Sequence, residues 1–555
     1  MNRPLRIAAL AGTLVAAVTA LAPPLAAQPA AQRTETPAAP PTFEEAIDVR
    51  VVNVEVVVTD REGNRVTGLG PEDLVLTVDG ERVPIDYFTE VRGGVAVAAE
   101  ADGEAAVPGV TAVVPGEPVG TSYLVFIDDW FPLARDRNHV LRELAGDLSD
   151  LGSADRMAVV AFDGRRVDLL TSWTGSRREL EQVFEAAQER DAHGLRRTGQ
   201  ERSFQTDAAP LDPRTAVLDA DEQGYANYVE GRVARAVDAA VAALRGFARP
   251  PGRKVMLLLS GGWPYSPAAY AVNDPQRPVF DYEYGHGPRI YEPLTDTANL
   301  LGYTLYPIDV PGLAGPFGVD ASNSGPETSA GSASYEREVQ AHATLRHLAA
   351  ETGGRPMINA FRNKALAETA TDTRSYYWIG FTPERRGDQA FHEIRVEAVG
   401  KGLKVRTREG YRDLSRQAEN DMAVESALLF GETPDGGGLE VAVGEPVREN
   451  RRFLILPVVV EIPVEAMTLL PEPAGTVVAN LELRVAAVDE RDRQSDVATI
   501  PFAVRLRRPP PDGETISYET RLRLRNQEHD VVLSLHDPIA GSSRMTRIEV
   551  SPVPR

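Results

Sequence analysis

The arrangement of hydrophobic and polar positions changes twice along the chain. In residues 43–92 apolar and polar residues alternate, and Asp79 and Gly80 supply a tight turn between two such runs. This pattern predicts a small β domain. From residue 121, strongly apolar runs alternate with helical ones, which is typical of a mostly parallel sheet covered on both faces. Short alternating runs return in residues 451–555 and predict an immunoglobulin-like β sandwich.

The α/β domain is expected to span residues 121–411. Two of its strands follow one another closely in "RMAVVAFDGRRVDLL" and read as a hairpin, which predicts one antiparallel edge strand in an otherwise parallel sheet. Three long inserted segments, 191–225, 263–292 and 311–334, are expected near one edge, and insertions of this length are usually functional or disordered. The predicted strands are 123–127, 157–162, 167–170, 254–259, 304–308, 356–358 and 376–381.

The N-terminus has the features of an export signal. Arg3 and Arg6 precede an apolar run, and small residues near Ala27 offer a cleavage point, so residues 1–27 are predicted to be a signal peptide and the protein to be periplasmic or secreted. An uncleaved membrane anchor is the alternative, although the run is shorter than the ~20 residues that a spanning helix needs. Linkers are predicted at 28–42 and 93–120, with a linking or helical segment at 412–450.

Composition narrows the classes of function. The 555 residues carry a formal net charge of −22, which argues against nucleic acid or an anionic membrane surface as the main partner, since both attract basic proteins. The chain has no cysteine, so cysteine-based catalysis and thiolate metal sites are excluded. No G-x-S-x-G, H-E-x-x-H or P-loop motif occurs, and His342 and His347 are five residues apart, on different faces of a helix.

Two carboxylates draw attention because of their position. Asp128 and Asp129 directly follow the first apolar strand of the α/β domain. In an open α/β sheet ligands bind at the carboxyl ends of the strands, so this edge is the predicted site.

Several phrases in order make the chain resemble the bacterial family of von Willebrand factor type A related proteins. They are "NVEVVVTDREGNRVTGLGPEDLVLTVDG", the strand that ends at Asp128, "VVAFDG", "GRKVMLLLSGG", "LGYTLYPIDVPGL", "LAAETGGR" and "SYYWIGFTPE". The resemblance covers about residues 49–411. It implies a type A α/β fold in an exported protein, and in many such domains a metal-ion-dependent adhesion site holds Mg²⁺ or Mn²⁺.

The family's adhesion motif, D-x-S-x-S, is altered here. Asp128 matches its aspartate, but Trp130 and Pro132 occupy the two serine positions. Ser260 and Gly261 replace the aspartate of a later loop, and the threonine ligand could be Thr198 or Thr215. Asp129 and Ser260 could add oxygen ligands to a rearranged site, because hard cations prefer such donors. A degenerate site, in which Asp128 only caps the next turn, is the alternative.

Aromatic residues near this edge are candidates for binding a partner. Trp130, Phe131, Trp263 and Tyr265 could anchor a protein or cell-surface partner, or could simply pack under loops. The sequence therefore favours an exported, non-catalytic binding protein. A hydrolase with a non-standard carboxylate or metal site and a structural envelope component remain alternatives.

Overall fold

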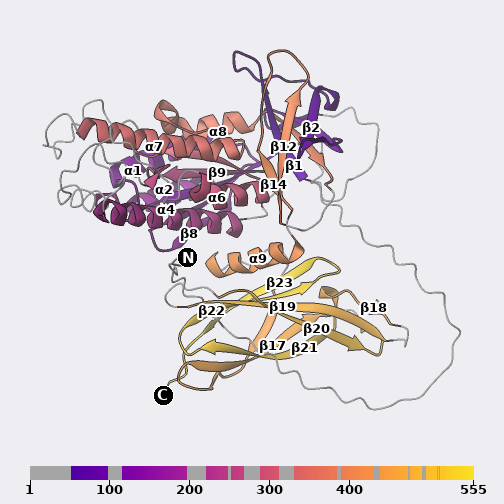
Figure 1. Cartoon of the computed structure of the whole chain (residues 1–555). Coiled ribbons are helices and arrows are strands. Elements are labelled where there is room, and N and C mark those ends of the chain that lie inside the picture. Colours follow the sequence, from indigo (N-terminus) through magenta and orange to yellow (C-terminus); the bar gives the residue numbers. More distant parts are fainter. Residues whose placement is uncertain are drawn as a thin grey trace, which may run out of the picture. The chain divides into compact units, whose positions relative to one another are not determined.

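The computed structural model divides the described chain into two compact units, one within Asp48–Arg416 and one within Gln417–Arg555 (Figure 1). The predicted signal peptide and first linker lie outside the described residues, as do Thr198 and Thr215. The described residues are 52–97, 115–196, 220–247, 250, 252–267, 288–311, 330–383, 389–413, 415–430, 438–472, 476–489, 495–508, 510–511 and 513–554.

A five-stranded sheet forms the centre of the first unit, in the order β10-β9-β6-β7-β8. Four strands are parallel and β8 is antiparallel to β7, so the predicted parallel sheet with one antiparallel edge is confirmed. All eight residues of β6 are buried, as expected for a strand covered on both faces. The strands are β6 (Thr121–Asp128), β7 (Arg156–Phe162), β8 (Val167–Thr174), β9 (Arg253–Ser260) and β10 (Tyr303–Asp309).

Helices cover this sheet on both faces (Figure 1). Leucine, valine and phenylalanine side chains of α1, α2 and α8 pack against one set of alternate strand residues. Helices α4 and α6 contact each other and the other face, and α7 packs against β10. Amphipathic helices on both sides explain why the sheet strands are continuously apolar. The helices are α1 (Ala134–Gly146), α2 (Arg177–Glu189), α4 (Ala220–Gly246), α6 (Pro288–Leu301), α7 (Ala330–Glu351) and α8 (Ala365–Thr373).

The small β domain is built from both ends of the first unit. One of its sheets has the order β13-β1-β11-β4-β5 and the other β14-β12-β2-β3, and they share one apolar core. Its strands are β1 (Val52–Thr59), β2 (Leu74–Val78), β3 (Glu81–Arg82), β4 (Tyr87–Arg92), β5 (Val95–Val97), β11 (Tyr376–Phe381), β12 (Phe391–Ala398), β13 (Lys404–Arg406) and β14 (Gly410–Arg412). The α/β domain is thus inserted between strands of a single β domain.

Two predicted strands of the central sheet were wrong. Strand β11 pairs with β1 and β4 in the β domain, because an apolar run specifies burial but not the sheet that buries it. The predicted strand at 356–358 makes only a single bridge, between Met357 and Ile308.

Asp372 at the end of α8 links the α/β domain to the β domain. Its Oδ2 accepts hydrogen bonds from Arg406 Nη2 and Tyr306 Oη, both at 2.6 Å, and its Oδ1 pairs with Arg65. Burial alone would raise the pKa of Asp372, but Arg406 and Arg65 outweigh it and hold the pKa well below the usual range. The ionised carboxylate therefore joins a helix to two strand regions.

The second unit is a β sandwich with one helix. Its two antiparallel sheets bury a common apolar core, which bears out a sandwich in this region. Helix α9 (Arg416–Phe430) packs Val424 and Leu428 against the outer face of the sheet that contains β19 and β22. The strands are β15 (Glu440–Val443), β16 (Val447–Arg448), β17 (Phe453–Pro463), β18 (Leu470–Pro471), β19 (Val477–Asp489), β20 (Ala498–Leu506), β21 (Thr515–Arg525), β22 (His529–Asp537) and β23 (Ser542–Val550).

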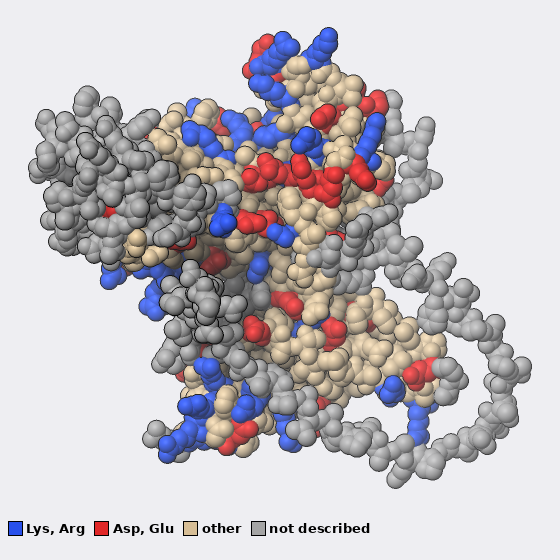
Figure 2. All heavy atoms as spheres, in the orientation of Figure 1, with Lys and Arg blue, Asp and Glu red and all other residues tan. Residues whose placement is uncertain are grey.

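Charges of both signs mix on the surface despite the acidic total. On the face drawn in Figure 2, lysine and arginine side chains lie among aspartate and glutamate. Ion pairs among the described residues include Arg412 with Asp296 and Arg547 with Asp530. Local arrangement, more than the net charge, therefore decides which partner each surface suits. Among the described residues no helix is long and apolar enough to cross a lipid bilayer.

Candidate functional site: the carboxyl edge of the central sheet

The strand order reverses between β6 and β9, so the chain runs to one side from β6 through β7 and to the other through β9. Such a switch point creates the crevice in which open α/β sheets bind ligands. Asp128 ends β6, Asp129 directly follows it and Ser260 ends β9, so all three residues predicted for the metal site lie at this crevice.

Four donors of the protein itself occupy the Asp128 carboxylate, which is fully buried. The backbone N–H groups of Trp130 and Phe131 donate to Oδ1 at 2.8 and 3.2 Å. The Gly261 N–H and the Trp263 indole Nε1–H donate to Oδ2 at 3.3 and 2.8 Å. The side chain thus caps its own turn and also ties β6 to the chain after β9.

Trp263 fills the crevice. Its side chain is fully buried and stacks on Tyr291 with ring centroids 6.3 Å apart, while the Tyr291 hydroxyl donates to the Pro264 carbonyl at 2.7 Å. Gly261 passes so close to the first loop that a Cβ there would lie 2.4 Å from Phe131 Cβ. Protein atoms therefore occupy the space where a ligand would enter a switch point.

Burial raises the pKa of Asp128 to about 6. The Trp263 indole and the amides of Phe131 and Trp130 act in the opposite direction, since they stabilise the ionised form. The raised pKa means that the site tolerates the negative charge rather than favouring it.

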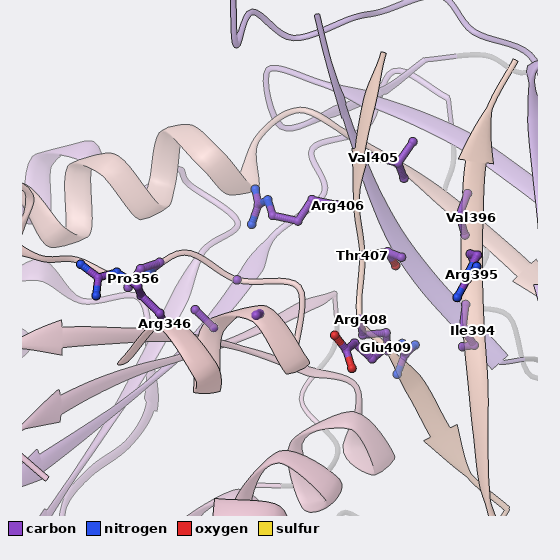
Figure 3. A pocket seen from close by; sticks show the side chains of 13 residues that line it. Arg346, Pro356, Ile394, Arg395, Val396, Val405, Arg406, Thr407, Arg408 and Glu409 are labelled. Atoms are coloured by element: carbon purple, nitrogen blue, oxygen red, sulfur yellow. The ribbon is translucent and has the colours of Figure 1, made fainter. Parts of the chain in front are cut away.

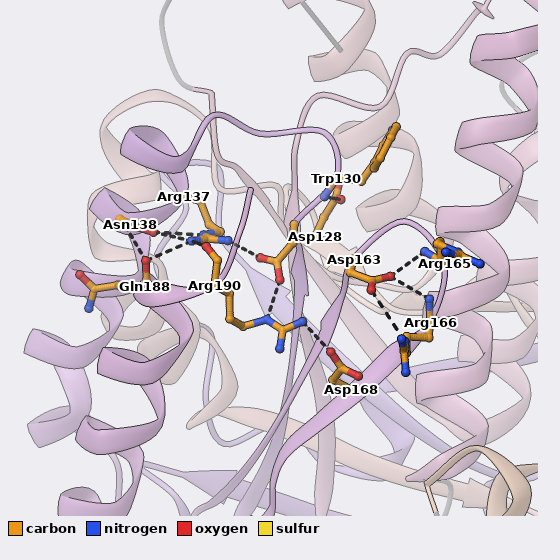
Figure 4. Close-up of polar contacts among 11 residues, drawn as sticks. Asp128, Trp130, Arg137, Asn138, Asp163, Arg165, Arg166, Asp168, Gln188 and Arg190 are labelled. Atoms are coloured by element: carbon orange, nitrogen blue, oxygen red, sulfur yellow. Dashed lines mark hydrogen bonds and ion pairs between the residues drawn. The ribbon is translucent and has the colours of Figure 1, made fainter. Parts of the chain in front are cut away.

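Asp129 is held by two arginines, Arg137 and Arg190; Figure 4 shows both of them, together with Asp168, the second partner of Arg190. Arg137 of α1 donates from Nη1 to Oδ1 at 2.6 Å, and Arg190, just after α2, donates from Nε to Oδ2 at 2.7 Å. Asp129 and Arg137 are both fully buried, and Arg190 also pairs with Asp168 at 2.7 Å. Burial raises the pKa of Asp129, and the two arginines oppose that effect.

Sequence reasoning missed both of these arginines. Arg190 is 61 residues from Asp129 along the chain, so its partner follows only from the fold. Arg137 offered a weak signal, because it lies one turn before the buried Val140 and Leu141 on the apolar side of α1.

Three of the four aromatic residues proposed for partner binding are packed inside the domain. Trp130 is 6% exposed, Phe131 2% and Trp263 0%, so their side chains offer little surface in this conformation. The Arg232 guanidinium of α4 covers the Trp130 ring at 3.8 Å from its centroid. Tyr265 is half-buried and meets the His347 ring edge to face at 5.8 Å.

The described residues at this edge do not fit a Mg²⁺ or Mn²⁺ site. N–H donors engage both oxygens of Asp128, and two cationic guanidinium groups engage Asp129, which opposes a second cation. Ser260 is buried, and its Oγ accepts a hydrogen bond from the backbone N–H of Trp263, with 3.5 Å between the nitrogen and the oxygen. Within the described part of the chain, no three His, Asp or Glu side chains are grouped so as to hold a metal ion.

Away from this edge, a hollow of about 490 Å³ lies between α7 and the strands β12 and β13 (Figure 3). Its arginines are largely committed to the fold. Arg406 reaches Asp372, Arg395 pairs with Glu393 at 3.1 Å, and Arg408 donates to the Asn299 carbonyl near the end of α6 at 2.8 Å, as a helix C-cap does. The lining residues are Arg346, Ala349, Ala350, Gly354, Pro356, Ile394, Arg395, Val396, Val405, Arg406, Thr407, Arg408 and Glu409.

No family model and no curated protein matches this sequence. Solved structures that match include Bacteroides uniformis β-glucuronidase, at 12% identity and a TM-score of 0.15, covering 33% of this chain and 19% of that one. A structure of Bacteroides uniformis β-glucuronidase 2 covalently bound to cyclophellitol-6-carboxylate aziridine matches with the same identity and coverage and a TM-score of 0.14. This chain therefore aligns with about a fifth of those enzymes, and TM-scores this low carry no information about its activity.

Proposed function

We propose that this is an exported binding protein of the von Willebrand factor type A related kind. In this proposal the carboxyl edge of the central sheet supports partner-recognition segments and needs no metal ion. The observation that carries the proposal is the closed switch point: Asp128 and Trp263 bond to each other where a ligand or ion would otherwise bind. The strand order, with an antiparallel β8 at one edge, supports the type A assignment.

The described residues that precede the long inserted segments lie at this edge. His193 N–H donates to the Asp129 carbonyl at 2.8 Å, just before residues 197–219. Trp263 precedes residues 268–287, and Val310, whose N–H donates to the Ser260 carbonyl, precedes residues 312–329. Rigid, internally satisfied carboxylates give these segments fixed points of origin, which suits a scaffold that presents loops.

A structural component of the cell envelope is the second candidate. It is favoured by the burial of Asp128 and Trp130, since a type A domain that no longer binds ligands has no reason to expose them. The immunoglobulin-like sandwich proposed for the second unit is compatible with either role, because that fold specifies no activity.

Thermal unfolding with Mg²⁺, Mn²⁺ or EDTA tests the metal-free part of the proposal. If an ion bound, at about 100 times its Kd it would add roughly 2.7 kcal/mol to the free energy of unfolding and raise Tm. Because the proposal has no ion at this edge, we expect no ion-dependent change in Tm. An increase that Asp128→Asn abolishes would show that the edge binds an ion and would overturn the proposal.

Capture of envelope proteins tests the binding part. The chain is compared in EDTA with a variant whose residues 268–287 are replaced by a Gly/Ser linker of equal length. We expect a specific partner to be lost in the variant while its Tm is unchanged. Equal capture by both proteins would contradict a recognition role for this segment, and capture by neither would favour the structural candidate.

A further inference from the structure

The two outer faces of the β sandwich differ in whether a helix packs on them. Helix α9 covers the face of the sheet that contains β19 and β22. The other sheet, formed by β15, β16, β17 and β21, has no helix of the second unit packed on its outer face among the described residues. Along β17 buried residues alternate strictly with half-buried ones, and the outward positions are Phe453, Ile455, Pro457, Val459, Glu461 and Pro463.

An apolar row therefore runs along the middle of this open face. Val447 of β16, which pairs with Ile455, extends the row and is 60% exposed. The β17 residues of the row are half-buried and Val447 is exposed, so together they form a contiguous apolar patch, and such patches mark contact surfaces.

Charges beside this row are ordered by sign. On β21 the outward residues run from Glu519 through Arg521 to Arg523 and Arg525, opposite Val459, Pro457, Ile455 and Phe453 of β17. Arg523 lies over the Phe453 ring at 3.8 Å and pairs with Glu449 at 2.9 Å. Glu519, Arg521 and Arg525 have no ion pair with any residue that the structure describes. The face is thus acidic toward one end and basic toward the other.

Such a face is complementary to itself. Consider two copies whose sheets face each other, related by a twofold axis that lies between the sheets, runs perpendicular to the strands and passes near Thr520 and Val458. Each β21 then lies antiparallel on the β21 of the other copy. Arg521 of one chain then meets Glu519 of the other, twice by symmetry, while Pro457 and Val459 meet at the centre. A purely acidic or purely basic partner would satisfy only one end of the face.

We propose that this face, defined by the outward residues of β17 and β21, is the interface of a twofold dimer formed by a second copy of the chain. The interaction is isologous, since each copy contributes the same surface. It is independent of the function proposed for the first unit.

The dimensions predict a weak dimer. Both β17 and β21 have 11 residues, which gives a length of about 35 Å, and three strands span roughly 14 Å. The three strands across the sheet are β21, β17 and the edge formed by β15 with β16. Each copy therefore buries about 500 Å², and the dimer on the order of 1,000 Å² in total, near the lower limit for a specific interface. We expect a dissociation constant in the micromolar range, so that dimerisation depends on concentration.

Sedimentation equilibrium over a wide concentration range tests the proposal with the chain lacking only its predicted signal peptide. Pro457→Lys should abolish the dimer, because it places a charge at the apolar centre of the contact, beside Arg521. Arg521→Glu and Glu519→Arg should each weaken it by about tenfold, because each reverses two symmetric charge pairs. The double variant, Arg521→Glu with Glu519→Arg, should restore the affinity, and this rescue distinguishes the specific interface from a general charge effect.

Arg505→Glu, on the outer side of β20 in the other sheet, is the matched control and should leave the dimer unchanged. Each variant should keep the wild-type Tm within a few degrees, because these side chains are not part of the core. A monomer at every concentration would overturn the proposal, as would a dimer that none of the three single substitutions at this face weakens.

Discussion

Two regions of the first unit bury aspartates among polar partners, with opposite electrostatic results. At the carboxyl edge, the pKa of Asp128 is raised to about 6, because burial outweighs its neutral N–H donors. At the junction with the β domain, arginines hold the pKa of Asp372 well below its usual value. Neutral donors satisfy the geometry of a carboxylate, whereas guanidinium groups also compensate its charge. Asp129 resembles Asp128 in that burial raises its pKa, and it resembles Asp372 in that two arginines pair with it.

The largest effect is expected from Asp129→Asn. It removes the charge that compensates Arg137, whose side chain is fully buried, and breaking such a pair costs about 3–5 kcal/mol. Urea unfolding of the first unit measures the change. Glu393→Gln, which breaks the exposed pair with Arg395, is the control and should change stability by less than about 1 kcal/mol. Equal effects of the two substitutions would contradict a buried, compensated pair.

A smaller loss is expected for Asp372→Asn. The side chain of Asp372 is buried, but Arg65 and Arg406 are 26% and 27% exposed, so water screens part of the lost interaction. We expect a destabilisation of about 2–3 kcal/mol. Because this carboxylate links the two domains, we expect the unfolding transition of the first unit to be broader in the variant than in the wild type, or to split. A sharp transition at the wild-type midpoint would show that the junction does not depend on Asp372.

The pH dependence should differ in sign between the two regions. Asp128 titrates at about 6 when folded and near 3.8 when unfolded, so the folded chain binds the extra proton between these values. Its contribution to the free energy of unfolding therefore falls as the pH rises from about 4 to 6, by at most roughly 3 kcal/mol. Asp372 stabilises the fold above its unfolded pKa, and this contribution is lost as the pH falls toward its lowered folded pKa.

Differences between wild type and variant isolate each term. The stability of the wild type relative to Asp128→Asn should decline from pH 4 to pH 6 and then level off. Relative to Asp372→Asn, it should increase with pH over the acid range. A flat difference for Asp128→Asn would mean that its pKa is not raised by burial.

Trp263→Phe should have the smallest effect of the four, about 2 kcal/mol at pH 7, because it removes one hydrogen bond to a charged group. The pKa of Asp128 should rise above 6, and the loss should shrink at pH 5, where the carboxyl is protonated. Trp378→Phe is the matched control. The indole nitrogen of Trp378 is buried and has no hydrogen-bond partner among the described residues. The loss of stability caused by Trp378→Phe should therefore not vary with pH.

The central sheet could be predicted because its strands are uniformly apolar and alternate with amphipathic helices, a pattern that specifies layers. The sheet that contains β11 could not, because "YYWIGF" shows that the segment is buried without showing which strands pair with it. Asp128 and Ser260 were located correctly at the edge of the sheet by their place after apolar strands. Their state was not predictable, since Trp263 approaches Asp128 across 135 residues.

The insertion of the α/β domain into the β domain has a mechanical consequence. The chain leaves the β domain after β5 and returns in β11, which pairs with β4 through Tyr376 and Val91. Strand β1, at the start of the unit, pairs with both β11 and β13. A pulling force applied at Val52 and Arg412 is therefore borne first by the hydrogen bonds between these strands. Force reaches the α/β domain through side-chain contacts such as that of Arg412 with Asp296, and through the chain itself only after the strands of the β domain separate.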